Sequence, residues 1–163
     1  NPDFTEFDLD IITYWFKLKK KLFKNMSFSV SYSLSEADNI SKNNGFLSTQ
    51  DKDRSYADTK IGIGISSKLF GKINIGSSIS IQNREYLSKF KNDIYHYNRS
   101  HEDKNYTFWA KTKLLDNMDI KVRTLYRERV TESSSKIVSS IKTFNKYEFW
   151  LSLIIKLDLN VYH

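Results

Sequence analysis

The chain has 163 residues, no cysteine and a formal net charge of +7 at pH 7. The missing thiols exclude disulfides and thiolate metal sites, and no run reaches the roughly 18 apolar residues of a membrane helix. One proline, five glycines and an aromatic content of 15% favour strands over helices, in a single domain over residues 1–163. A basic chain suits nucleic acid, anionic lipid or acidic polymers, and charge alone does not choose among them.

Seven segments alternate apolar and polar residues with the period of two that one-sided strands show. In chain order they cover residues 7–23, 28–34, 56–69, 72–88, 105–115, 119–129 and 146–163. Tight turns at residues 24–25, 71 and 116–117 join three of the pairs, and long polar loops at 39–54, 89–103 and 132–145 join the others. Short turns at one end and long loops at the other are typical of an outer-membrane meander. We therefore expect an all-β fold, an antiparallel up-and-down transmembrane β-barrel.

The apolar parity fills the interior of a soluble barrel and faces lipid in a membrane barrel. Tyrosines cluster where the strands meet the long loops, and we interpret them as an aromatic girdle at the lipid interface. Its members are Tyr32, Tyr56, Tyr86, Tyr106, Tyr126 and Tyr147. The alternative interpretation is that tyrosine is simply a favourable strand residue. The last segment keeps an unbroken apolar parity from Tyr147 to Val161, long enough to cross a bilayer.

The hairpins predict a register if the apolar faces of neighbouring strands coincide. The expected partners are Leu69 with Ile73, Leu114 with Ile120, Leu18 with Val30, and Phe16 with Tyr32. This register sends Trp15, Lys17, Lys19 and Lys21 to the polar side. An odd set of strands starts at the outer surface, whereas single-chain bacterial barrels have an even number. We therefore expect a missing rising strand upstream, so that the chain is part of a larger barrel or closes with a partner's strand.

The strand and loop rhythm from Asp53 to Asn160 resembles the final strands of Gram-negative outer-membrane barrels. The likeness runs from "DRSYADTKIGIGIS" through "GKINIGSSISIQNREY" and "NYTFWAKTKLLDNMDIKVRTLYRE" to "KYEFWLSLIIKLDL", with a loop opening at Arg99 to Asp103. The barrels concerned follow tetratricopeptide repeats, as in surface lipoprotein assembly modifiers and exopolysaccharide-export porins. Such chains commonly end in an aromatic residue, whereas here Tyr162 precedes a terminal His163. The resemblance implies the bacterial outer membrane, with a lipid bilayer and other outer-membrane or periplasmic chains as partners.

Basic residues on the polar parity form a predicted lumen wall, which would attract an anionic solute or acidic polymer. The wall consists of Lys111, Lys113, Lys121, Arg123, Arg127, Arg129 and Arg84. The alternative is a plug in which these cations pair with Glu148, Asp158, Asp8 and Asp10. The polar parity of residues 62–80 is small, being mostly glycine and serine, and leaves room for a channel.

Evidence for catalysis or metal binding is thin. His96 and His101 share one predicted loop with Ser100 and Asp103, but no nucleophile elbow or metal-ligand spacing accompanies them. Nucleic-acid binding is disfavoured because the cations lie on the parity opposite the aromatics. We expect no enzyme, cofactor or metal, and an outer-membrane barrel that acts as a translocation or export pore or as a membrane scaffold. The alternative of another class is a soluble ligand-binding barrel with the apolar face inside.

Overall fold

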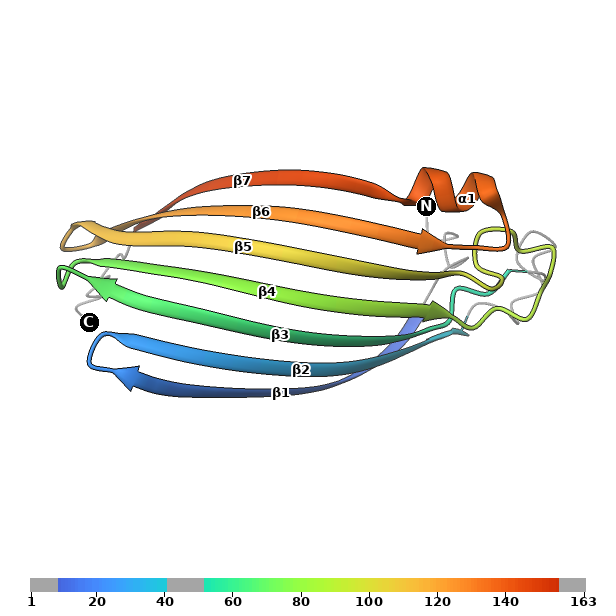
Figure 1. Ribbon diagram of the computed structural model, residues 1–163, viewed down its shortest axis with the longest axis horizontal. Helices are drawn as coiled ribbons and strands as arrows, with labels where there is room; N and C mark the ends of the chain where they lie inside the picture. The colour runs from blue at the N-terminus through green and yellow to red at the C-terminus, as the bar shows by residue number, and fades with distance from the viewer. Residues whose placement is uncertain (1–8, 41–51, 156–163) are drawn as a thin grey trace, which may run out of the picture.

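The computed structural model describes residues 9–40 and 52–155. Seven antiparallel strands form one sheet in sequence order, joined by tight turns at one end and long connections at the other (Figure 1). The strands are β1 (Leu9–Phe23), β2 (Met26–Asn39), β3 (Tyr56–Leu69), β4 (Ile73–Tyr86), β5 (Ser100–Leu115), β6 (Met118–Glu132) and β7 (Phe144–Ile155). The predicted all-β meander of seven strands is confirmed. The apolar run beyond Ile155, with Asp8 and Asp158, lies outside the described residues.

The first two hairpins have the predicted register. Leu18 pairs with Val30, Phe16 with Tyr32, and Leu69 with Ile73 across a turn in which Gly71 has φ +69°. The prediction for the third hairpin is wrong, because Ile120 pairs with Thr112 and the register shifts between Lys113 and Leu115. This irregularity adds one residue to β5 near the turn, so the observed partner of Ile120 is one position from where Leu115 opposite Met118 would place it, and two from the predicted Leu114.

One predicted loop contains a helix. α1 (Lys136–Lys142) lies between β6 and β7, and Ser135 caps it by accepting a hydrogen bond from the Val138 backbone N–H. Val138 is 2% exposed, and its burial holds the helix at the sheet end. A serine cap followed by apolar residues at helical spacing was the sequence signal for it. No helix in the described part of the chain is long and apolar enough to cross a membrane.

Burial on the two faces of the sheet is the reverse of that in a water-soluble sheet, because here the polar face is buried and the apolar face is exposed. Within the described residues the buried hydrophobic residues are only Ala37, Tyr56, Leu125 and Val138. The buried polar residues are three times as numerous, and most of those on strands lie on the polar parity. Every strand exposes apolar side chains of this parity, as at Tyr147 (80%) and Phe16 (61%), although most of those on β6 are half-buried. The sheet therefore curves around its polar face, which we call the concave face, and presents its apolar parity on the convex face.

The sheet is open in the described structure, with β1 and β7 at its two edges. Each neighbouring pair is antiparallel, so all odd-numbered strands run in one direction and the two edges are parallel to each other. An all-antiparallel closure therefore requires an odd number of additional strands between them.

Candidate functional site

The concave face contains a hollow of about 310 Å³ in the middle of the sheet. Its cations come from distant strands: Lys17 from β1, Lys60 from β3, and Arg123 and Arg127 from β6. Hydroxyl and amide groups complete the lining, and none of the described carboxylates lines it. The hollow is therefore a polar, positively charged cradle.

Small residues make the floor of this hollow. They are Ser29, Ser31, Gly62, Gly64, Ser78 and Ser80. A Cβ atom added to Gly62 would lie 2.8 Å from Ser31 Oγ, so the three central strands pack their small side chains in close contact. Ser31 Oγ also donates to the Gly62 carbonyl at 3.5 Å. The predicted small parity of residues 62–80 thus lines the hollow at 62, 64, 78 and 80, while Ser29 and Ser31 fill the space directly beside the two glycines.

Gly76 differs from the other small residues of this parity. A Cβ atom there would lie 2.5 Å from the indole of Trp109, its register partner on β5. The indole therefore covers Gly76 and limits the open floor on the side of the tight turns. This close approach explains why glycine stands at position 76.

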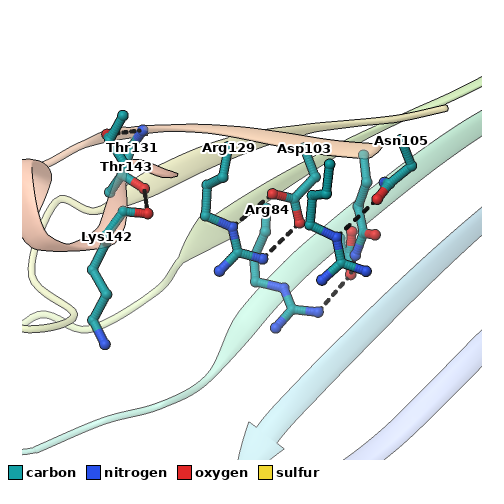
Figure 2. A network of polar contacts seen from close by, with 10 residues as sticks. Arg84, Asp103, Asn105, Arg129, Thr131, Lys142 and Thr143 are labelled. Atoms are coloured by element: carbon teal, nitrogen blue, oxygen red, sulfur yellow. Dashed lines mark hydrogen bonds and ion pairs between the residues drawn. The ribbon is translucent and has the colours of Figure 1, made fainter. Parts of the chain in front are cut away.

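Near the long connections, the predicted basic wall is neutralised by direct cross-strand partners (Figure 2). Arg129 makes two 2.6 Å hydrogen bonds to Asp103, and Arg84 donates to Asp58 at 2.8 Å. Arg127 instead donates Nε–H to the Asn105 amide oxygen at 2.8 Å, so its charge is not cancelled by that partner. The wall therefore consists of paired arginines beside the connections and uncancelled charge at the hollow.

Near the tight turns, the remaining wall residues also comprise some that form ion pairs and some that do not. Lys111 forms an ion pair with Asp119 at 2.8 Å, and exposed Lys113 pairs with Asp116 at 2.6 Å. Lys121 lies opposite Lys111 on β6 without an ion pair among the described residues. Arg123 lies over the Trp150 ring at 4.9 Å.

Of the four carboxylates predicted to neutralise the wall, Asp8 and Asp158 lie outside the described residues, and neither Glu148 nor Asp10 forms an ion pair with a wall residue among those described. Glu148 pairs with Lys146 at 2.8 Å, and Asp10 lies on the convex parity opposite Asp38. The partners that sequence reasoning missed are Asp58, Asp103 and Asp119. For Asp58 a signal existed, because the correctly predicted register of the second hairpin places it opposite Arg84.

The structure separates the six predicted girdle tyrosines into two groups. Tyr106, Tyr126 and Tyr147 are register partners on the convex face, with ring centroids 5.9 and 4.6 Å apart, and Tyr32 lies on the same face. Tyr56 and Tyr86 pair with each other on the concave parity, because they share the parity of Asp58 and Arg84. Arg84 lies 3.8 Å from the Tyr56 ring centroid, so these two rings support the charged network rather than the exposed band.

The histidine group is divided between two elements rather than forming one loop cluster. His101 and Asp103 are buried on the concave parity of β5, and Ser100 lies on the opposite parity. His96 belongs to the connection before β5, where its Nδ1 is 2.9 Å from the Asp93 carboxylate. Ser88 donates to the same carboxylate rather than to the imidazole, so this group lacks the hydroxyl-to-imidazole contact of a nucleophilic triad.

Burial lowers the pKa of His96, although the neighbouring Asp93 opposes this shift. A neutral imidazole at neutral pH donates Nδ1–H to Asp93, since the carboxylate is the acceptor. Across the described ranges, no group of three or more His, Asp or Glu side chains is placed to hold a metal ion.

Comparisons with protein-family models, with curated proteins and with solved structures found no match to this chain.

Proposed function

We propose that the chain forms part of the wall of a transmembrane β-barrel in the bacterial outer membrane, with a basic lumen that admits anionic solutes or acidic polymers. One observation carries the proposal: all seven strands expose apolar side chains on the convex face, while polar and charged side chains surround a hollow. Exposed apolar area on this scale marks a surface that contacts lipid or protein. Strands of 12–16 residues are also long enough to cross a bilayer at a tilt.

The distribution of charge along the convex face supports the same orientation. The central stretch of the face is apolar, as at Ile61, Ile63, Ile79 and Phe108. Charged residues of this parity gather toward the long connections, among them Glu36, Glu85, Glu102, Lys104 and Glu128. A lipid-facing band bounded by tyrosines and then by charges is the pattern of an outer-membrane barrel. A soluble ligand-binding barrel would need the apolar parity around the hollow, and the residues lining it are mainly polar.

Closure of the barrel needs strands from elsewhere, and a second copy of the sheet supplies them poorly. Two copies related by a twofold axis along the barrel would place β1 beside β7 of the other copy in parallel, because both edges run the same way. We infer an odd number of added strands, from another part of the same polypeptide or from another outer-membrane protein.

The first experiment tests which face contacts lipid. The full chain is reconstituted into vesicles containing brominated lipids, with a single tryptophan placed at Phe149 on the convex face or kept at Trp150 on the concave face. The proposal expects strong quenching at position 149 and weak quenching at 150. Equal quenching, or a chain that stays in water without lipid contact, would refute the membrane assignment.

A second experiment separates the pore from the scaffold. A basic lumen predicts anion-selective conductance across a planar bilayer for the complete assembly, and Lys17→Glu with Arg123→Glu should shift the reversal potential toward cations. Lys89→Glu, outside the strands, is the control. A membrane-inserted assembly without conductance would favour the scaffold and reject the pore.

A further inference from the structure

A second hollow, of about 460 Å³, lies at the end of the sheet that bears the long connections. The ends of β3, β4 and α1 meet there with the connection over residues 87–99. Its lining contains five cations and one carboxylate: Lys52, Arg54, Arg84, Arg99 and Lys142, with Asp93. It is distinct from the central hollow, because the two share no lining residue.

Arg99 is the unusual residue of this hollow. It is 8% exposed, and its guanidinium carbon lies 3.7 Å from the Tyr86 ring centroid. Among the described residues no carboxylate forms an ion pair with it, and its buried Nε has no hydrogen-bond acceptor. Arg84 and Arg129, by contrast, each bond a carboxylate. Tyr86 is a hydrogen-bond partner of this guanidinium but carries no full negative charge, and a buried guanidinium without an ion-pair partner is unfavourable, so an anion from outside would stabilise this position.

The carboxylate of the hollow is already occupied by other donors. Asp93 accepts from the Asp53 backbone N–H at 2.9 Å, from Ser88 Oγ at 3.2 Å and from His96 Nδ1 at 2.9 Å. These bonds fold the connection against the start of β3. Asp93 therefore stabilises the fold of the connection and does not form an ion pair with the Arg99 guanidinium.

The backbone around Arg99 is fixed independently of its side chain. The Arg99 carbonyl accepts from the Tyr86 N–H at 2.9 Å, and the preceding Asn98 adopts φ +48°, a left-handed conformation that asparagine tolerates. Burial lowers the pKa of Arg99, yet arginine remains protonated at neutral pH. The guanidinium is thus a preorganised, charged donor directed into the hollow.

We propose that this hollow binds an oxyanion group, phosphate, sulfate or carboxylate, with Arg99 as the principal ligand. Arg99 offers a planar fork that suits such groups, and exposed Lys142 at the end of α1 adds charge at the hollow. The rings of Tyr56 and Tyr86 also line the hollow, tilted by 60° to each other, and each carries a guanidinium over one face. This site needs only the connection end of the sheet, so it stands apart from the proposed pore.

Isothermal titration calorimetry on the full chain in detergent tests the proposal. The probes are inorganic phosphate, sulfate, glucose 6-phosphate and glucuronate. We expect saturable binding, at least about tenfold weaker in Arg99→Gln, with Arg99→Lys between that variant and the wild type because lysine keeps the charge and loses the fork. Tighter binding of the two sugar acids than of the inorganic ions would identify an acidic saccharide as the ligand, and the reverse order a free oxyanion.

A second variant keeps the test valid if Arg99→Gln perturbs the connection. Lys142→Gln changes an exposed side chain whose backbone carbonyl alone bonds Thr131, and it should weaken binding a few-fold without changing the far-ultraviolet circular dichroism. Lys89→Gln, outside the lining of both hollows, should leave binding unchanged. The proposal would be overturned if the wild type did not bind, or if the Arg99 and Lys142 variants bound as tightly as the wild type. Conductance of the complete assembly is measured in a separate experiment. An assembly without conductance would reject the pore but would not affect the interpretation of the calorimetry.

Discussion

The convex and concave faces are made by the same strands, yet they follow opposite rules of burial. On β6, Tyr126 stacks with Tyr147 in a row on the convex face, while the next residue, Arg127, bonds Asn105 on the concave face. On β5, exposed Phe108 neighbours Trp109, which covers Gly76. Side chains alternate across a strand, so each strand contributes to both environments. Polar contacts therefore hold the concave face together, and many apolar side chains of the convex face are left exposed in the described part of the chain.

The same positive charge added to each face should have its largest effect on the convex one. Ile79→Lys places an ammonium in the apolar band and should destabilise the inserted protein by about 2–4 kcal/mol, the cost of lysine near a bilayer midplane. Ser80→Lys, one residue along on the concave face, should cost less than about 1 kcal/mol because the lysine reaches a polar hollow. Urea unfolding in phospholipid vesicles measures both. Equal losses of unfolding free energy in the two variants would contradict the assignment of the convex face to lipid and the concave face to water.

On the concave face, the buried ion pairs should matter more than the exposed ones. Asp103→Ala leaves Arg129 without the two hydrogen bonds it makes now, and we expect a loss of about 2 kcal/mol. Asp116→Ala is the matched control, since its partner Lys113 is exposed, and it should leave the unfolding midpoint unchanged. A double variant that also replaces Arg129 by methionine should recover part of the loss. A midpoint that does not move in Asp103→Ala would show that this pair does not hold the face together.

The concave floor should tolerate a methyl group unevenly. Gly76→Ala meets the Trp109 indole and should destabilise the protein by about 1 kcal/mol, with a shift in tryptophan emission as the ring moves. Gly62→Ala meets the small hydroxyl of Ser31, which can rotate, and should have a smaller effect without the spectral shift. Thermal unfolding and fluorescence spectra test both variants. An identical response would mean that Trp109 does not seal the floor.

The smallest expected effect concerns the connection that folds over the concave end. Because the pKa of His96 lies below its ordinary value of 6.5 in the folded protein, the open state binds the proton more readily. The connection is therefore most stable above pH 6.5 and loses stability as the pH falls from there toward the lowered pKa. Hydrogen-exchange protection over residues 87–99, corrected for intrinsic rates, should decline in this window. His96→Gln should weaken this pH dependence, and a wild type with constant protection would contradict the assignment.

The sequence by itself determined the strand count, the tight turns, the parity of each strand and two of the hairpin registers. These features are local, since alternation repeats every two residues and a tight turn fixes its own hairpin. The pairing of Asp58 with Arg84 also follows from such a register, because Leu69 opposite Ile73 propagates along β3 and β4. The division of the tyrosines follows as well once Tyr56 and Tyr86 are counted along the same hairpin.

Only the tertiary structure decided the remaining features. The irregularity before Leu115 shifted β5 against β6, and without it Asp103 could not be matched to Arg129. The gathering of Lys17, Lys60 and Arg123 around one hollow depends on the curvature of the whole sheet, because these residues come from strands far apart in sequence. The position of buried Arg99 in the lining of the second hollow depends on how residues 87–99 fold back through Asp93. Such contacts join distant segments in space, and a period of two within each strand carries no information about them.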